Sequence, residues 1–185
     1  MKKFILTIAT LLFFGCTGNG VIVTFDDDKS NAIRQHFQNY LNNDMDGLKS
    51  LWSEDLQVFL NSVEPISLDE LVGLLEAQHD TFSITMSWGN NEDIGYWVET
   101  ASYPGDDSYD PATVTQTWFN WIATSNLTGE TITLPAHISF FWGDDGKIAA
   151  EYHTYDTAEM EAAIAEAQAA AIAAAIAEAQ AASQQ

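Results

Sequence analysis

Four histidines titrate closest to neutral pH in this sequence and are the first candidates for acid–base chemistry: His36, His79, His137 and His153. The last two flank the turn sequence Asp144-Asp145-Gly146. If these three residues form a hairpin loop with Gly146 in the left-handed conformation, counting outward from the loop places His137 directly opposite His153 on the same sheet face. A register one residue different would place them on opposite faces.

A same-face pair of imidazoles can share a proton, a ligand or a water, so we predict His137 and His153 as a catalytic acid–base pair. The alternative is two strand histidines satisfied by polar neighbours. His36 and His79 fall on predicted helices, where packing is the commoner role. Glu151 lies near this pair, but no third metal ligand follows at a clear spacing, so we expect no metal. Phosphate-binding and nucleophile-elbow motifs are absent from the sequence, and we expect no cofactor.

The aromatic residues predict a second kind of site. The chain has 6 Trp, and alternation along one predicted strand puts Trp118 and Asn120 on one face and Phe119 and Trp121 on the other. One of these faces must present indole rings to a pocket or to a partner. We predict a pocket for a small, largely apolar or cyclic ligand, and the alternative is an aromatic core with a dimer face. The predicted pocket residues are Trp118, Asn120, Tyr155, Trp52 and His36.

Length and charge limit the classes of function. The 185 residues suit one ordinary domain with short appendages, and 27 acidic against 6 basic side chains give a net charge of −21. A field of that sign repels phosphate backbones, which excludes nucleic acid as a partner.

The N-terminus predicts export. Lys2 and Lys3 precede an apolar run over residues 4–14, and Gly15 supplies a small residue for cleavage. A helix of that length spans about 16 Å, too short for a hydrocarbon core of about 30 Å. We therefore predict a signal peptide over residues 1–15. The stretch Leu-Phe-Phe-Gly-Cys ending at Cys16 resembles a bacterial lipobox, which implies lipidation of Cys16.

That resemblance implies a lipid-anchored protein of a bacterial cell envelope, either periplasmic or at the outer membrane. Residues 16–29 are predicted as the tether. The apolar patch at residues 21–25 within it is compatible with an edge strand or a linker.

The remaining pattern predicts helices first and strands afterwards. Ser30 or Asn31 can cap a first helix, residues 45–52 form a second short one, and Ser67 with Glu70 forms a capping box for a third. Alternating runs from Phe82 to Tyr155 predict a meander of strands, which favours an α+β fold with helices on one face of a curved antiparallel sheet over residues 30–157. Residues 158–185 are Ala-rich and predict a helix that extends into solvent or associates weakly with itself.

Two segments carry a resemblance to a known family. "NNDMDGLKSLWSEDLQVFL" and "LPAHISFFWGDDGKIAAEYHTYD" resemble the SnoaL-like branch of the nuclear transport factor 2-like superfamily. The resemblance implies a cone-shaped α+β barrel in which the sheet wraps the first long helix and leaves a pocket at the wide end. Members include cyclases, isomerases, dehydratases and epoxide hydrolases, so the fold alone does not give the reaction.

The catalytic sets of that family are incompletely present. The isomerase-type carboxylate at the end of the first strand falls on Phe59-Leu60-Asn61, and the epoxide-hydrolase-type aspartate on the last strand falls on His153. Arg34 is the only arginine. The polyketide-cyclase type needs an acid–base pair in an apolar pocket, which His137 and His153 can supply.

The sequence thus predicts a cell-envelope lipoprotein whose SnoaL-like domain binds a small apolar molecule. One alternative is a cyclase, isomerase or hydratase using the two histidines. The other is a scaffold that dimerises, without a ligand, through an open sheet face.

Overall fold

A computed structural model describes residues 20–88 and 95–183 of the chain. The predicted signal peptide and Cys16 lie outside these residues. The elements, in chain order, are β1 (Ile22–Thr24), α1 (Asp28–Leu41), α2 (Met45–Lys49), β2 (Trp52–Leu60), α3 (Leu68–Thr81), β3 (Phe82–Ser87), β4 (Trp97–Tyr103), β5 (Ala112–Ser125), β6 (Thr131–Trp142), β7 (Ile148–Tyr155) and α4 (Thr157–Ala182).

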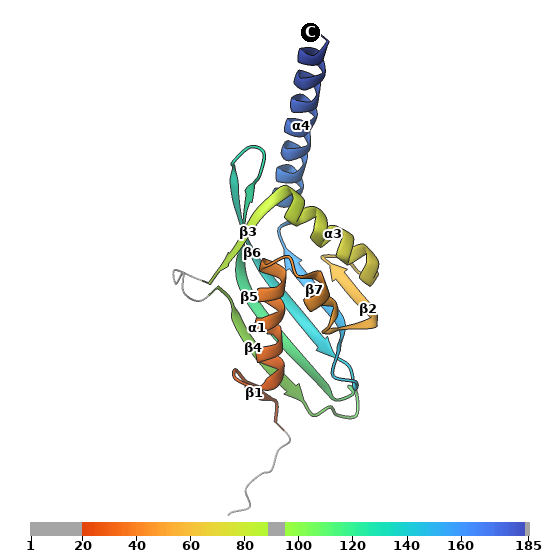
Figure 1. The fold of residues 1–185 in the computed structure, drawn as a ribbon. Helices are drawn as coiled ribbons and strands as arrows, with labels where there is room; N and C mark the ends of the chain where they lie inside the picture. Colours follow the sequence, from red (N-terminus) through yellow and green to blue (C-terminus); the bar gives the residue numbers. More distant parts are fainter. Residues whose placement is uncertain (1–19, 89–94, 184–185) are drawn as a thin grey trace, which may run out of the picture.

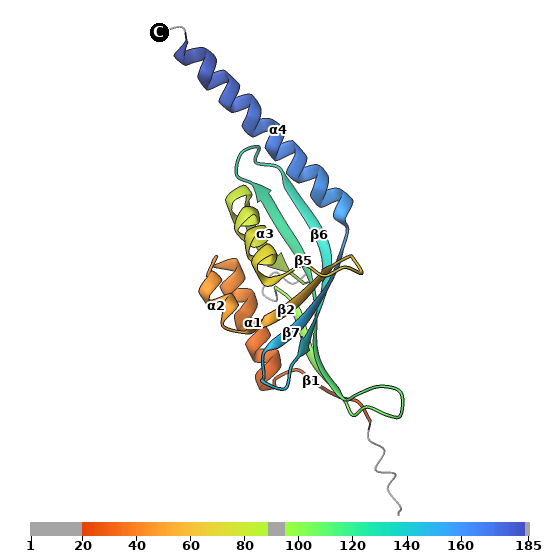
Figure 2. The same cartoon turned by 90° about the vertical axis from the view of Figure 1, so that its right-hand side faces the viewer.

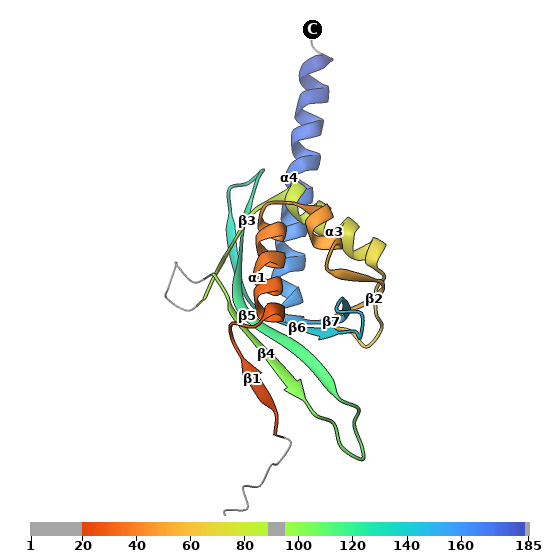
Figure 3. The ribbon, with the colours of Figure 1, turned by 60° about the horizontal axis from the view of Figure 1, so that its bottom comes forward.

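The fold is α+β, as predicted: seven strands form one curved sheet in the order β1-β4-β5-β6-β7-β2, and β3 also pairs with β5. Along β5, one half pairs with β3 and the other with β4. The sheet is mixed, whereas the sequence predicts an antiparallel one, because β2 joins its edge parallel to β7. Helices α1, α2 and α3 all lie on the inner, concave face of the sheet, so the domain is a cone with a helical side and an open outer side (Figures 2 and 3).

The N-terminal part of the fold begins before residue 30. Strand β1 pairs antiparallel with β4, so the apolar patch at residues 21–25 contains an edge strand. The cap of α1 is Asp27, whose carboxylate accepts from the backbone N–H groups of Lys29 and Ser30. Ser30, a predicted cap, is instead buried inside the helix, where its hydroxyl lies 2.8 Å from that of Thr100.

Two further local predictions have different outcomes. The capping box of Ser67 and Glu70 is confirmed: the Ser67 hydroxyl accepts from the Glu70 N–H, and the Glu70 carboxylate accepts from the Ser67 N–H at 2.8 Å. Trp52 was expected at the end of the second helix, but it opens β2, opposite Ile148 of β7. That position turns its indole inward, and its exposed fraction is 5%.

The core lies between the inner face of the sheet and the helices. Its buried members come from nearly every element, and the most deeply buried include Ile33, Leu48, Val58, Leu134, Phe140 and Ile148. Helix α4 differs, since it follows β7 directly and most of its length projects beyond the body of the domain (Figure 1). The predicted Ala-rich helix is therefore confirmed. In the described part of the chain, α4 alone is long and apolar enough to cross a membrane, by length and composition only.

Candidate functional site

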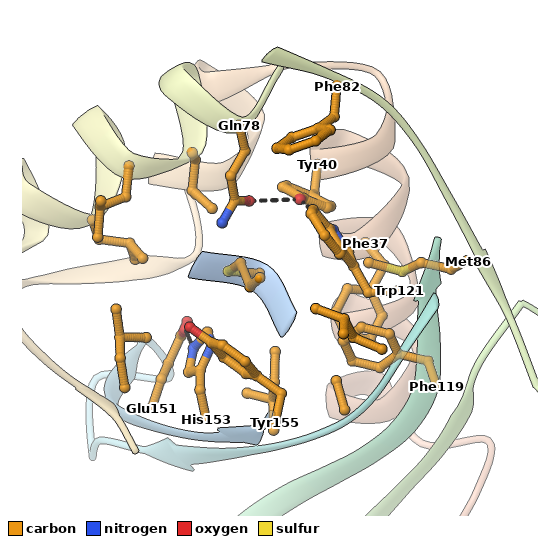
Figure 4. Close-up of a pocket in the computed structure, with 18 of the residues that line it drawn as sticks. Phe37, Tyr40, Gln78, Phe82, Met86, Phe119, Trp121, Glu151, His153 and Tyr155 are labelled. Carbon is orange, nitrogen blue, oxygen red and sulfur yellow. Dashed lines mark hydrogen bonds and ion pairs between the residues drawn. The ribbon is translucent and has the colours of Figure 1, made fainter. Parts of the chain in front are cut away.

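A cavity of about 460 Å³ lies inside the cone. Its walls are the inner face of the sheet, helices α1 and α3, and the first turns of α4, which contribute Met160, Ile164 and Gln168. Most of the lining is apolar, with aromatic rings from α1, β3, β5 and β6 (Figure 4). A volume of this size suits a drug-sized organic molecule.

One end of the cavity holds a carboxylate–imidazole pair on β7. Glu151 and His153 are two residues apart on one strand, so both side chains point to the inner face. The Nε2 atom of His153 lies 2.8 Å from a Glu151 carboxylate oxygen, and the other oxygen accepts from the Trp52 indole N–H at 2.5 Å. Glu151 is only 2% exposed, and these two donors satisfy it.

The surroundings of Glu151 keep it ionised. Burial raises its pKa, but the hydrogen bond and charge of His153, with smaller contributions from His36 and Trp52, hold the pKa below its ordinary value. Because an ionised carboxylate only accepts hydrogen bonds, His153 presents Nε2–H to it, so Nδ1 is the nitrogen that carries the lone pair in the neutral form of the ring. The arrangement therefore supplies a basic nitrogen supported by a buried anion.

His36 on α1 is the third titratable group at this end. Its ring packs edge-on against Trp52, with centroids 5.1 Å apart, and its Nδ1 is buried without a hydrogen-bond partner. Burial lowers its pKa to about 4, against the opposing effect of Glu151. His36 is consequently a neutral imidazole at pH 7.

Another wall of the cavity carries neutral polar groups. The Tyr40 hydroxyl donates to the Gln78 side-chain oxygen at 2.8 Å and accepts from the Trp121 indole N–H at 2.8 Å. Figure 4 shows this group across the cavity from Glu151 and His153. Burial raises the pKa of Tyr40, so its hydroxyl stays protonated and can serve only as a hydrogen-bonding group at neutral pH.

The predicted same-face pair of histidines is wrong. The loop itself forms as expected, with the Gly143 N–H donating to the Lys147 carbonyl at 2.8 Å and Gly146 at φ 77°. Beyond it, however, Trp142 pairs with Ile148 and Phe141 pairs with Ala150, which leaves Ala149 as an extra residue in β7. This bulge shifts every later pair by one, so His137 faces Thr154 and lies on the outer face.

The predicted pocket residues divide between the two faces in the same way. Trp52, Tyr155 and His36 line the cavity, as the sequence predicts. Trp118 and Asn120 do not: Trp118 pairs with His137 across the ladder, and their rings lie 4.7 Å apart on the outer face. The predicted alternation along β5 is confirmed, and the inner face is that of Phe119 and Trp121.

Sequence reasoning missed Glu151 as the partner of His153, and Tyr40, Gln78 and Trp121 as polar lining. For Glu151 a signal was present, since a Glu-x-His sequence on a strand places both side chains on one face whatever the register. No local signal joins Tyr40 to Gln78, because they lie on two helices 38 residues apart. Among residues 20–88 and 95–183, no group of three or more His, Cys, Asp or Glu could hold a metal ion.

Comparison with known proteins identifies the fold. No family model and no curated protein matches the sequence. Solved structures do match: IdmH, a proposed polyketide cyclase from Streptomyces antibioticus, has a TM-score of 0.52 at 13% identity, covering 75% of this chain and 99% of that one. AclR, a proposed hydroxylase from Streptomyces galilaeus, has a TM-score of 0.51 at 13% identity, covering 69% and 88%.

A proposed polyketide cyclase from Xanthomonas campestris matches with a TM-score of 0.50 at 15% identity, covering 73% of this chain and 95% of that one. These identities carry the fold and not the reaction. The chain therefore shares the α+β fold of these solved structures, as the sequence resemblance implies.

Proposed function

We propose that this domain binds a small, largely apolar molecule in the cavity between the sheet and helices α1, α3 and α4. One observation carries the proposal: a cavity of about 460 Å³ is lined mainly by apolar and aromatic side chains, with hydrogen-bonding groups on separate walls. Filled cores leave few voids larger than a water molecule, so a space of this size in a small domain is typical of a ligand site.

The test is to fill the cavity with a large side chain introduced on the inner side of strand β6. Ala136 lines the cavity, whereas Ser139 lies on the outer face of the same strand β6, beside Gln116. An Ala136→Trp variant should lose binding of a neutral environment-sensitive dye such as Nile red, and Ser139→Trp should keep it. Equal dye binding by the two variants would place the dye elsewhere and remove the support for a cavity ligand.

A second candidate is an enzyme that uses His153 as a general base. The supporting observation is the 2.8 Å contact between His153 and the buried Glu151 within the cavity, because a carboxylate that orients an imidazole is a recurring catalytic arrangement. His137 takes no part in this proposed mechanism, because it lies on the outer face of the sheet. The neighbours IdmH and AclR are described as a proposed cyclase and a proposed hydroxylase, which makes proton transfer on a cyclic substrate a reasonable reaction class.

For the cell, we propose a lipid anchor at Cys16 that holds the domain at a bacterial envelope membrane. The support is the sequence alone: the charged start, the short apolar run and the lipobox-like stretch before Cys16. A Cys16→Ala variant should move from the membrane fraction to the soluble fraction of the envelope. If it stays with the membrane, the lipidation proposal fails.

A further inference from the structure

No described lysine or arginine side chain lines the cavity. The part of the chain that the structure describes has four Lys and Arg residues, and none lines the cavity: Lys29, Arg34, Lys49 and Lys147. Arg34 donates to the Phe25 carbonyl at 2.6 Å, and Lys29 lies over the Trp142 ring at 4.1 Å. An anionic ligand would therefore enter the cavity without a counter-charge.

Glu151 adds a fixed negative charge to the lining. Among the described residues that line the cavity it is the only carboxylate, and it accepts hydrogen bonds from Trp52 and His153. Two donors aimed at one carboxylate favour its ionised form. His153 can add at most one positive charge, when it is protonated. The pair of an ionised Glu151 and His153 is therefore either neutral or negative.

The other lining groups also favour a positive ligand. Eight Phe, Tyr and Trp side chains line the cavity: Phe37, Tyr40, Trp52, Phe82, Phe119, Trp121, Phe140 and Tyr155. The faces of such rings attract cations, most strongly where water is excluded. Beyond the cavity, the net charge of −21 raises the local concentration of cations and lowers that of anions.

We propose, on the premise that the cavity is a ligand site, that it selects a cyclic apolar molecule carrying a protonated amine and rejects one carrying a carboxylate or phosphate. Glu151 is the specificity-determining residue. Fatty acids and phosphorylated or coenzyme A-linked molecules are thereby excluded as ligands.

Three molecules with one ring system test the selection. Naphthylmethylamine is protonated at pH 7, naphthylmethanol is neutral and naphthoate is anionic, and their dissociation constants for the intact protein can be measured by calorimetry. A unit charge a few ångströms from Glu151 should separate the amine from the carboxylate by at least about 100-fold in affinity, with the alcohol between them. An alcohol as tight as the amine, or a carboxylate as tight as either, would overturn the proposal.

Two further measurements separate Glu151 from the general acidity of the chain. Raising NaCl from 150 to 500 mM screens exposed charges but leaves a buried one effective, so the amine-to-carboxylate ratio should fall by no more than about threefold. Glu151→Gln should reduce the amine-to-carboxylate affinity ratio from about 100-fold to about tenfold or less. Glu130→Gln, at an exposed position, should leave this ratio unchanged.

The salt series decides the point even if Glu151→Gln fails to fold, as judged by near-ultraviolet circular dichroism. Loss of the ratio at 500 mM NaCl, or its full retention in a folded Glu151→Gln variant, would overturn the assignment to Glu151. If none of the three molecules binds but Nile red does so in the Ala136-dependent way, the charge selection fails and the proposed binding function stands. If Nile red also fails to bind, both fail.

Discussion

The two faces of strands β5, β6 and β7 carry similar residue types, but these residues make different contacts on each face. On the inner face, His153 contacts Glu151, and the indole N–H of Trp121 donates to Tyr40. On the outer face, His137 rests on Trp118 and makes no such hydrogen bond through its buried Nε2. Residue type is thus a poor guide to function here, because the register of one hairpin decides whether His137 shares the inner face with His153 and Glu151.

The largest expected difference between the faces is in stability. Glu151→Ala removes a buried acceptor and leaves the Trp52 N–H and His153 without their partner, and should lower the free energy of unfolding by about 4 kcal/mol. His137→Ala, on the outer face, should cost about 1 kcal/mol or less, the usual effect away from buried networks. Urea unfolding followed by tryptophan fluorescence measures both. Similar losses in the two variants would contradict the contrast.

Catalysis, if present, should follow the same division. A His153→Asn variant loses the basic Nδ1 and should lower kcat by about 100-fold or more, the typical contribution of a general base. His137→Asn should leave kcat within about twofold of the unmodified protein. Candidate substrates are cyclic compounds with an acidic C–H, assayed by hydrogen–deuterium exchange. Exchange that survives in His153→Asn would remove His153 from the mechanism.

The third contrast depends on pH. His36 on the inner side has a pKa of about 4 in the folded protein, against about 6.5 for an unfolded histidine. Between these values the unfolded chain binds a proton that the folded chain does not, so stability is present at pH 7 and falls as the pH drops from about 6.5 towards 4. From pH 7 to pH 5 the loss attributable to His36 should be about 2 kcal/mol.

A His36→Phe variant provides the control for this pH effect. Phenylalanine keeps an aromatic ring against Trp52 and Phe140 but cannot take up a proton. Unfolding free energies at pH 7 and pH 5 should then differ by about 2 kcal/mol less than in the unmodified protein. Glu151, with a pKa held below its ordinary value of 4.5, adds little to the pH dependence between pH 7 and pH 5. An unchanged pH dependence would show that His36 ionises freely in the folded state.

Much of the fold follows from local patterns in the sequence. The capping box before α3, the alternation along β5 and the Ala-rich repeat of α4 each depend on residues close together in the chain, and the structure confirms them. The start of α1 was misplaced because Asp27 and Ser30 are both good caps. What decides between them is tertiary: Ser30 hydrogen bonds to Thr100 on β4, 70 residues away.

The candidate site is harder to predict, for a related reason. The loop residues Gly143 and Gly146 behave as expected, but the bulge at Ala149 has no local signal, and one extra residue is enough to exchange the faces of a strand. Tyr155 and His36 lie in the pocket as predicted, because helix and strand periodicity fixes their inner faces, whereas Trp52 reaches the pocket from β2 and not from the predicted helix. Trp118 was placed wrongly because large aromatic residues occupy both faces of β5.

The smallest expected effect on stability belongs to the outer face, and it bears on the remaining alternative of a dimer. Trp97, Phe141 and Tyr152 are 39%, 36% and 43% exposed. They lie on strands β4, β6 and β7, and the charged residue on the outer side of these strands is Glu99. In a chain of net charge −21, a face with so little charge is where two copies can approach with the least repulsion.

If two copies do meet there, Trp97→Ser combined with Tyr152→Ser should shift the protein to monomer in sedimentation equilibrium and change the free energy of unfolding of the monomer by less than about 1 kcal/mol. Tyr109→Ser, at a loop position that is 76% exposed, is the matched control and should leave association unchanged. A dimer that persists in the double variant would show that the copies meet elsewhere. If the unmodified protein is a monomer at all concentrations, this aromatic face is exposed to solvent. Strands β5–β7 would then line the cavity with their inner face and contact no second copy with their outer face.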